Sequence, residues 1–349
     1  MANVVYVPRV IKVNHGPDAT WVINDAFDLR WSSVNKTTAV TADLGAIGSL
    51  AGTMQKSRWQ ASGNYVSIAQ GSSSTFHSIA KRTGDVTTLT KLTSGVPTWS
   101  NNRMNSCWPD DNTLVVVGEI ATRVEICTRS GDVFSNVASP LDVQPGGNCY
   151  GVDCTPNGQT LIVSYTYDGS KNLTTYTRSG NQFNVANNYT VGTGSNNGLA
   201  IAISPDGTKC AAFCNGTTPA VLRTFSISGS ALTQTNANLI SSGTGGSRAD
   251  LKYSPSGKFL FFGTDSGGTT TNMQTWNVET GYTLCTLGVT AISVRSLGYS
   301  PTGKFIITGD TSASTVIWEQ DSSTGSLTLK TVLTAGGTGA GFSVNEFQP

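Results

Sequence analysis

The sequence predicts an all-β protein built from a repeated unit of about 48 residues, and three observations support this prediction. A four-residue turn of the form Ser/Thr-Pro-x-Gly recurs along the chain at a near-constant interval. A second turn, which contains Ser-Gly or Thr-Gly, recurs at the same interval and stays in phase with the first. A short apolar segment follows each proline-containing turn except the last, which coincides with the end of the sequence. Two turn types that keep one period indicate that each repeat is a single supersecondary unit.

The first turn places proline where φ is preset and glycine where a positive φ is needed. Its copies, looser ones included, start at Trp108, Thr155, Ser204, Ser254, Ser300 and Gln348. The prolines in these copies are spaced 47, 49, 50, 46 and 48 residues apart. Residues 61–63 continue the series upstream without a proline, and residues 16–19 resemble its start.

Each repeat has room for four short strands, which are separated by the two turn types. Second strands are predicted at residues 20–24, 64–69, 113–118, 160–166, 208–214, 258–263 and 304–309. Four antiparallel strands per repeat predict a β-propeller, in which radial blades protect the edges of their neighbours. Seven second strands predict seven blades, so residues 16–349 are expected to form one seven-bladed domain.

The Ser-Pro-Asp-Gly turn at residues 204–207, with the apolar strand after it, resembles the repeats of WD40-like and lactonase-like (YVTN-type) propellers. The resemblance covers essentially the whole chain and implies the propeller fold. The chain departs from the WD40 pattern, because Trp276 and Trp318 are followed by Asn277 and Glu319 rather than Asp. Only two histidines exist, His15 and His77, so the His/Asp/Trp network of WD40 blades is not expected.

The two ends of the chain are predicted to meet in one composite blade. Residues 339–349 have the pattern of a first strand that stops at its turn, and residues 20–24 supply a matching second strand. We therefore expect the C-terminal strand, residues 341–347, to insert beside residues 20–24 and to close the ring. Residues 1–15 are then an N-terminal arm or an extra strand.

Composition limits the classes of partner. The chain has 12% charged residues, a formal net charge of +1 and no basic cluster, which argues against nucleic acid. No apolar run is long enough to span a membrane, and the N-terminus lacks the charged and apolar regions of a signal peptide. Cys107 and Cys154 each stand two residues before a turn proline, at a position that is apolar in other repeats. Both are expected to act as small buried apolar side chains.

The central channel is the expected place for any chemistry. Side chains alternate along a strand, so residues three and five positions before the turn proline are predicted to face the channel. Six of these positions carry charge: Lys56, Arg58, Asp153, Asp250, Lys252 and Glu346. The sequence contains no catalytic triad motif, phosphate loop or Cys-x-x-Cys motif, and no catalytic, cofactor-binding or metal-binding residue is expected. A ligand site around Arg58, Asp153 and Glu346 is the alternative.

These features favour a non-enzymatic structural or binding propeller. Low charge and a surface rich in Ser, Thr, Gly and Asn resemble virion proteins of tailed bacteriophages, so the expected role is a tail or capsid-surface component that attaches to other protein subunits. A host-surface ligand is a further possible partner, and the virion is the expected location. Two alternatives stay open: a lactonase-like hydrolase and a cytoplasmic WD40-like scaffold.

Overall fold

The computed structural model describes the chain with gaps. The described residues are 10–13, 20–23, 42–43, 53–71, 77–82, 89–99, 102–119, 124–138, 141, 147–166, 171–192, 200–215, 220–240, 249–265, 273–285, 294–300, 302–309 and 314–334.

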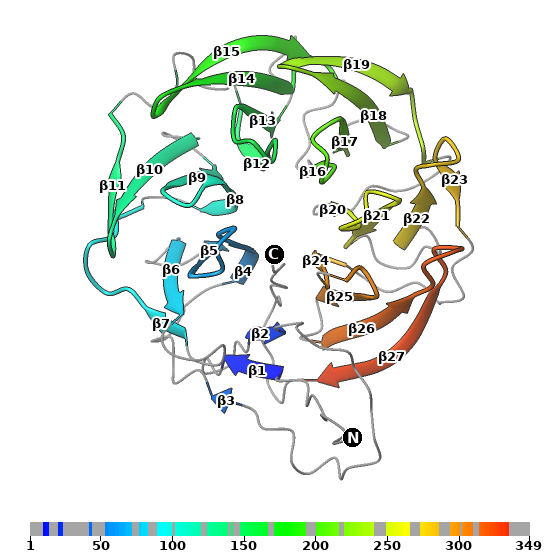
Figure 1. Cartoon of the computed structure of the whole chain (residues 1–349), viewed down its shortest axis with the longest axis horizontal. Coiled ribbons are helices and arrows are strands. Elements are labelled where there is room, and N and C mark those ends of the chain that lie inside the picture. The colour runs from blue at the N-terminus through cyan, green and yellow to red at the C-terminus, as the bar shows by residue number, and fades with distance from the viewer. Residues whose placement is uncertain are drawn as a thin grey trace, which may run out of the picture.

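Six four-stranded antiparallel sheets surround a common centre, and we name them blades 1 to 6 in chain order (Figure 1). The first strand of each blade lies innermost and the fourth lies at the rim (Figure 1). Blade 1 consists of β4 (Thr53–Trp59), β5 (Tyr65–Gly71), β6 (His77–Arg82) and β7 (Leu89–Lys91). Blade 2 consists of β8 (Arg103–Asp110), β9 (Thr113–Gly118), β10 (Val124–Ser130) and β11 (Val133–Asn136). Blade 3 consists of β12 (Cys149–Cys154), β13 (Thr160–Tyr165), β14 (Leu173–Ser179) and β15 (Gln182–Tyr189). Blade 4 consists of β16 (Ala200–Ile203), β17 (Lys209–Cys214), β18 (Val221–Ser228) and β19 (Ala231–Asn236). Blade 5 consists of β20 (Ala249–Tyr253), β21 (Phe259–Thr264), β22 (Met273–Asn277) and β23 (Thr283–Leu284). Blade 6 consists of β24 (Ser296–Tyr299), β25 (Phe305–Gly309), β26 (Ser314–Gln320) and β27 (Leu327–Thr334).

The prediction of an all-β propeller with four-stranded antiparallel blades is confirmed, but the count of seven blades is wrong, because the described residues form six. The N-terminal segment forms a three-stranded sheet instead. In it β1 (Val10–Val13) pairs antiparallel with β2 (Thr20–Ile23) and parallel with β3 (Ala42–Asp43). The predicted second strand at residues 20–24 therefore exists as β2, but its partner is β1, a segment to which the repeat spacing gave no blade. The predicted closing strand at residues 341–347 lies outside the described residues.

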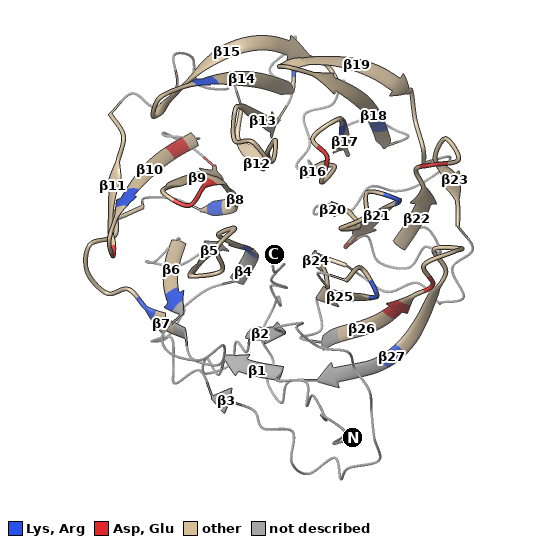
Figure 2. Ribbon diagram, in the orientation of Figure 1, with Lys and Arg blue, Asp and Glu red and all other residues tan. Residues whose placement is uncertain are grey.

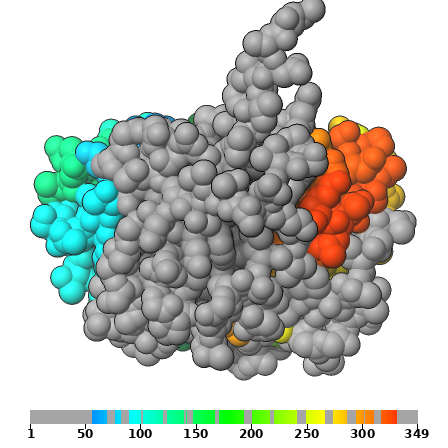
Figure 3. Space-filling view, turned by 90° about the horizontal axis from the view of Figure 1, so that it is seen from below, coloured from blue at the N-terminus to red at the C-terminus, as the bar shows by residue number. Residues whose placement is uncertain are grey.

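Viewed from below, the ring shows strands from blade 1 and blade 6 at opposite sides (Figure 3). The cyan residues at one side include β7, and the orange-red residues at the other belong to β26 and β27 (Figure 3).

Among the described residues, no helix is long and apolar enough to cross a membrane.

The core consists of apolar clusters between successive blades. Blades 4 and 5, for example, share a cluster that includes Phe213, Leu222, Phe262 and Trp276. Because the second strands are covered on both faces, most of their residues are apolar without alternation, and all six residues of β9 and of β21 are buried. This explains why the second strands were the most readily predicted elements, at 113–118 and 160–166 for example.

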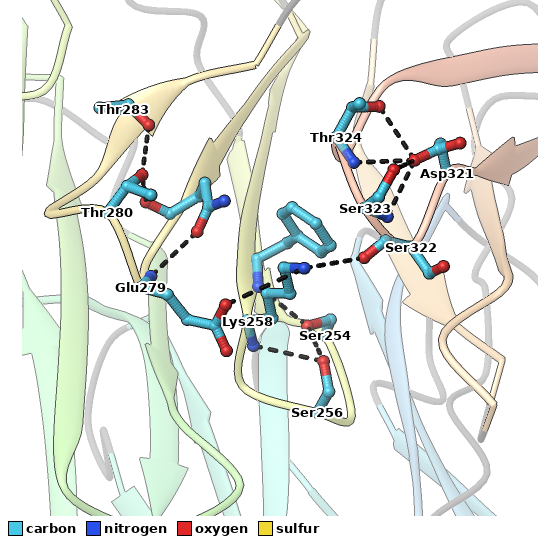
Figure 4. Close-up of polar contacts among 12 residues, drawn as sticks. Ser254, Ser256, Lys258, Glu279, Thr280, Thr283, Asp321, Ser322, Ser323 and Thr324 are labelled. Carbon is cyan, nitrogen blue, oxygen red and sulfur yellow. Dashed lines mark hydrogen bonds and ion pairs between the residues drawn. The ribbon is translucent and has the colours of Figure 1, made fainter.

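The proline-containing turns fold as their residues predict. In blade 5 the Ser254 hydroxyl accepts a hydrogen bond from the amide of Phe259 (3.0 Å), and Gly257 N donates to Ser254 O (2.8 Å). Gly257 has a φ of 73°, which favours glycine. The same turn also joins neighbouring blades, because the Lys258 ammonium donates to the Ser322 carbonyl of blade 6 at 3.0 Å (Figure 4).

Successive turns also pack against one another around the ring. A Cβ atom added at Gly158 in blade 3 would lie 2.2 Å from the Pro109 carbonyl oxygen of blade 2, and one at Gly207 would lie 3.0 Å from Cδ of Pro156. The turn glycine therefore provides both a positive φ and room for the preceding blade.

A Gly158→Ala substitution is expected to destabilise the ring more than Gly180→Ala, which serves as its control. Both glycines have a positive φ, 66° and 61°, so both variants incur the left-handed penalty of about 1–2 kcal/mol. Nothing lies within 4 Å of a Cβ added at Gly180, whereas Gly158 adds a clash with Pro109 worth about 1–3 kcal/mol. Denaturant unfolding of both variants measures the difference. Equal losses of stability would show that the turns do not pack tightly.

Candidate functional site

The inner strands bring five of the six charged candidates together at the centre of the ring. Lys56 and Arg58 lie on β4, Asp153 on β12, and Asp250 and Lys252 on β20. Blades 1 and 5, which carry β4 and β20, face each other across the centre (Figure 1), and Figure 2 marks the charged positions along the strands. We call these five residues the axial cluster. The sixth candidate, Glu346, lies outside the described residues.

An ion pair across the ring is the central contact of the cluster. The Lys56 ammonium lies 2.7 Å from Oδ1 of Asp250 and also donates to the Ala249 carbonyl at 3.1 Å. The Arg58 guanidinium approaches the same carboxylate oxygen at 4.0 Å. Because residues 56 and 58 are two apart on one strand, both side chains project from the same face of β4. The ion pair joins two blades that are not neighbours in the ring.

Asp250 is held as a carboxylate by backbone amides as well as by cations. Its Oδ1 accepts from Leu251 N at 3.1 Å, and its Oδ2 accepts from Leu297 N of blade 6 at 3.0 Å. Burial opposes ionisation of this side chain, which is 1% exposed. The charges of Lys56, Arg58 and Lys252 outweigh the burial and lower the pKa of Asp250 below its ordinary value.

Asp153 accepts the same pattern of backbone hydrogen bonds as Asp250, but its pKa shifts in the opposite direction. Its Oδ1 accepts from Cys154 N at 3.0 Å, and its Oδ2 accepts from Ile203 N of blade 4 at 2.8 Å. Burial raises the pKa of Asp153 above its ordinary value, and Lys252 and Arg58 offset the effect only in part. The residue as a whole is nevertheless partly exposed to solvent, unlike Asp250. A carboxylate that combines a raised pKa with solvent access is suited to proton transfer.

The three cations are buried to a similar degree. Lys56, Lys252 and Arg58 are 7%, 8% and 9% exposed. Burial lowers the pKa of Lys56. The positive charges of Arg58 and Lys252 lower it further, whereas the Asp250 carboxylate raises it. With three cations and two carboxylates, the cluster carries an excess of one positive charge (3 − 2 = 1) when all five groups are ionised. It is therefore suited to an anionic or strongly polarised ligand.

A second group of buried polar residues, between blades 1 and 2, was missed by the sequence reading. His77 is 4% exposed, and its ring contacts Trp99 edge-on with centroids 4.6 Å apart. Within the described part of the chain, neither of its ring nitrogens has a hydrogen-bond partner. Arg103 is fully buried and forms an ion pair with Glu125. Burial, together with the charge of Arg103, lowers the pKa of His77 to about 3. Arg103 stands six residues before the turn proline, outside the positions predicted to face the channel, so the strand pattern gave no signal for it.

Among the described residues, no group of three or more His, Cys, Asp or Glu side chains is arranged to hold a metal ion.

No protein-family model and no curated protein sequence matches the chain. Solved structures do match in fold. A candidate 6-phosphogluconolactonase from Bacteroides uniformis aligns with a TM-score of 0.65 and 13% identity, over 81% of this chain and 85% of that protein. A second candidate 6-phosphogluconolactonase, from Bacteroides fragilis, aligns with a TM-score of 0.62 and 16% identity over 81% and 85% of the two chains. The periplasmic gluconolactonase of Pseudomonas aeruginosa aligns with a TM-score of 0.61 and 15% identity over 81% and 86%.

Identities of 13–16% show a shared propeller fold. The expectation of a virion component of a tailed bacteriophage is corrected by these matches, because the structural neighbours carry gluconolactonase names. The physical reason for the error is that low charge and Ser/Thr/Gly/Asn-rich turns follow from the propeller architecture itself and do not distinguish one propeller function from another.

Proposed function

We propose that the protein is a lactonase-like hydrolase that opens a sugar lactone at the axial cluster. The observation that carries the proposal is Asp153, a partly exposed residue whose carboxylate accepts hydrogen bonds from two backbone amides and lies close to the charges of Lys252 and Arg58. The gluconolactonase names of the structural neighbours support the choice of substrate class.

Lactone hydrolysis is acyl transfer to water, and it needs two kinds of group. A base must take a proton from the attacking water, and positive charge must stabilise the oxyanion that forms on the lactone carbonyl. We assign the first role to Asp153. Its two backbone hydrogen bonds occupy one lone pair on each oxygen and leave others free to accept from water.

We assign oxyanion stabilisation to Arg58 and Lys252, whose charges act on Asp153. Both are buried, and positive charge in a poorly solvated site stabilises a developing anion more strongly than it does in water. Asp250 keeps the cluster assembled, because it holds Lys56 across the ring and binds the backbone of blade 6. The excess positive charge of the cluster favours a lactone that carries a phosphate or carboxylate.

The test is hydrolysis of glucono-δ-lactone and its 6-phosphorylated form by the purified protein, followed by acid release in a pH-stat. We expect both to be opened faster than in buffer, with a lower KM for the phosphorylated lactone. Lys252→Met should reduce this preference, because it removes a cation from the cluster. Lys209→Met is the matched control, since Lys209 begins β17, its side chain is 39% exposed and it pairs with Asp206. Hydrolysis of neither lactone above the buffer rate would reject the proposal.

A further inference from the structure

The proline-containing turn of blade 2 departs from the pattern of the later blades at one position. In blades 3 to 6 the residue before the turn proline is serine or threonine, and its hydroxyl accepts a hydrogen bond from the amide five residues later. The accepting residues are Thr155 (3.1 Å), Ser204 (2.9 Å), Ser254 (3.0 Å) and Ser300 (2.9 Å). In blade 2 this position is Trp108, whose indole has a donor and no acceptor. A residue that gives up the local bond of its own turn is expected to have a role elsewhere.

Trp108 forms its hydrogen bond across the seam between blades 1 and 2. Its indole N–H donates to the carbonyl of Arg58 on β4 at 3.1 Å. Trp108 is 9% exposed and packs edge-on against Phe134 of blade 2, with ring centroids 6.0 Å apart. It belongs to an apolar cluster that also includes Tyr65 and Ile79 of blade 1. Because this packing fixes the ring, the indole N–H is a donor of fixed direction.

A second donor reaches the same carbonyl. The Ser67 hydroxyl of β5 donates to the Arg58 carbonyl at 3.3 Å and lies 2.6 Å from the Ser106 hydroxyl of β8. Ser67 and Ser106 are fully buried. Trp108 and Ser106 are both on β8, so the backbone of β4 at Arg58 is joined to blade 2 twice, once directly and once through Ser67.

The Arg58 side chain is tied to the same stretch of backbone. Its Nη1 donates to the Ser57 carbonyl at 3.1 Å, and its Nη2 lies 4.0 Å from Oδ1 of Asp250. Without such an anchor, an arginine side chain samples many rotamers. The guanidinium therefore moves with the backbone of residues 57 and 58, and that backbone is held by blade 2.

We propose that Trp108 is a positioning residue, which holds Arg58 where its guanidinium can stabilise the oxyanion of the lactone. The inference rests on the proposed function, because that function gives Arg58 its role. Stabilisation of a developing anion depends on donors and charges that are in place before the reaction. Loss of the indole N–H should therefore act on kcat, through the orientation of Arg58, and leave the charge of the axial cluster and KM unchanged.

The test compares Trp108→Phe with Trp318→Phe in lactone hydrolysis. Both changes remove the N–H of a buried indole and keep an aromatic ring, since Trp318 Nε1 donates to Thr308 Oγ1 at 3.0 Å within blade 6. We expect Trp108→Phe to lower kcat about tenfold, less than the removal of an oxyanion donor, with KM unchanged within about twofold. Trp318→Phe should keep the wild-type kcat, because its hydrogen bond joins two strands of blade 6 and leaves β4 unchanged.

Two further readouts separate positioning from a general loss of stability. In an Arg58→Met background, Trp108→Phe should lower kcat no further, because no guanidinium is left to position. The second readout is the rate at which phenylglyoxal, a reagent for arginine, modifies Arg58, measured by peptide mapping of the folded protein. Loss of one hydrogen bond should raise that rate about fivefold in Trp108→Phe and leave it unchanged in Trp318→Phe.

An unchanged kcat in Trp108→Phe, equal decreases in the two tryptophan variants, an additive effect in the Arg58→Met background, or an unchanged modification rate in Trp108→Phe would each overturn the inference. The modification rate needs no turnover. If the wild type opens neither lactone, the proposed function fails, and the rate still decides whether Trp108 holds Arg58. If Trp108→Phe does not fold, Ser67→Ala removes the other donor to the same carbonyl and should lower kcat in its place. An unchanged kcat in Ser67→Ala would then overturn the inference.

Discussion

Replacing Asp250 with asparagine is expected to lower the free energy of unfolding by about 3–5 kcal/mol. Asparagine keeps the shape of the side chain and one oxygen acceptor, but it removes the charge that lies 2.7 Å from the Lys56 ammonium. Of the two carboxylates in the axial cluster, Asp153 would then be the one that remains beside the cations. Removing one partner of a buried ion pair is costly because the remaining charge has no water to solvate it.

The matched control is Asp132→Asn. Asp132 pairs with Lys81 at 2.8 Å, nearly the same distance, but their side chains are 49% and 36% exposed. Water and salt screen such a pair, so the loss should stay below about 1 kcal/mol. Denaturant unfolding of the two variants at neutral pH gives the comparison. Similar losses at the two sites would mean that the axial cluster is solvated and does not hold the ring together.

Stability is expected to fall as the pH is lowered from about 6.5 toward 3, with His77 as the main cause above pH 4. The pKa of His77 is lowered from 6.5 to about 3 in the folded protein, so the unfolded chain binds the proton first. The stabilisation that comes from keeping His77 neutral is fully present above pH 6.5, and it is lost as the pH falls to about 3, the pKa of His77 in the folded protein. The slope for one such group is about 1.4 kcal/mol per pH unit, and the full window amounts to about 5 kcal/mol.

His77→Phe isolates this effect. Phenylalanine keeps an aromatic ring beside Trp99 and has no group to protonate, and the buried ring nitrogens that it replaces have no hydrogen-bond partner among the residues that the structure describes. We expect the variant to match the wild type at pH 7 to within about 1.5 kcal/mol and to lose less stability between pH 6.5 and 4. Asp250 titrates below its ordinary value of 3.8, outside this window. Asp153, whose pKa is raised, contributes with the opposite sign, but equally in both proteins. Parallel stability curves for the two proteins would show that His77 is solvated.

Much of the fold could be predicted from sequence because its determinants are local. A Ser/Thr-Pro-x-Gly turn fixes its own backbone geometry, and the apolar segment that follows it forms the second strand of a blade. The predicted second strand at 113–118 coincides with β9, and that at 258–263 lies within one residue of β21. Alternation along the inner strands likewise selected Lys56, Arg58, Asp153, Asp250 and Lys252, five charged residues that the structure brings together.

The remaining features depend on contacts between distant segments. Spacing assigned residues 20–24 to a blade, but strand pairing joined them to Val10–Val13, and no local pattern distinguishes these outcomes. Alternation selected both Lys56 and Asp250 without indicating that they pair across the ring. The environment of His77 on β6 depends on Trp99 and Arg103, which lie 22 and 26 residues further along the chain.

The central claim, that the axial cluster is a hydrolytic site with Asp153 as its base, is tested most directly by comparing kcat for lactone opening in the wild type and in Asp153→Asn. Asparagine can still accept one of the two backbone hydrogen bonds, so the variant should fold, as thermal unfolding would verify. Loss of a general base predicts a decrease in kcat of about 10²–10⁴-fold with little change in KM. A folded Asp153→Asn protein that opens the lactone at the wild-type rate would contradict the account.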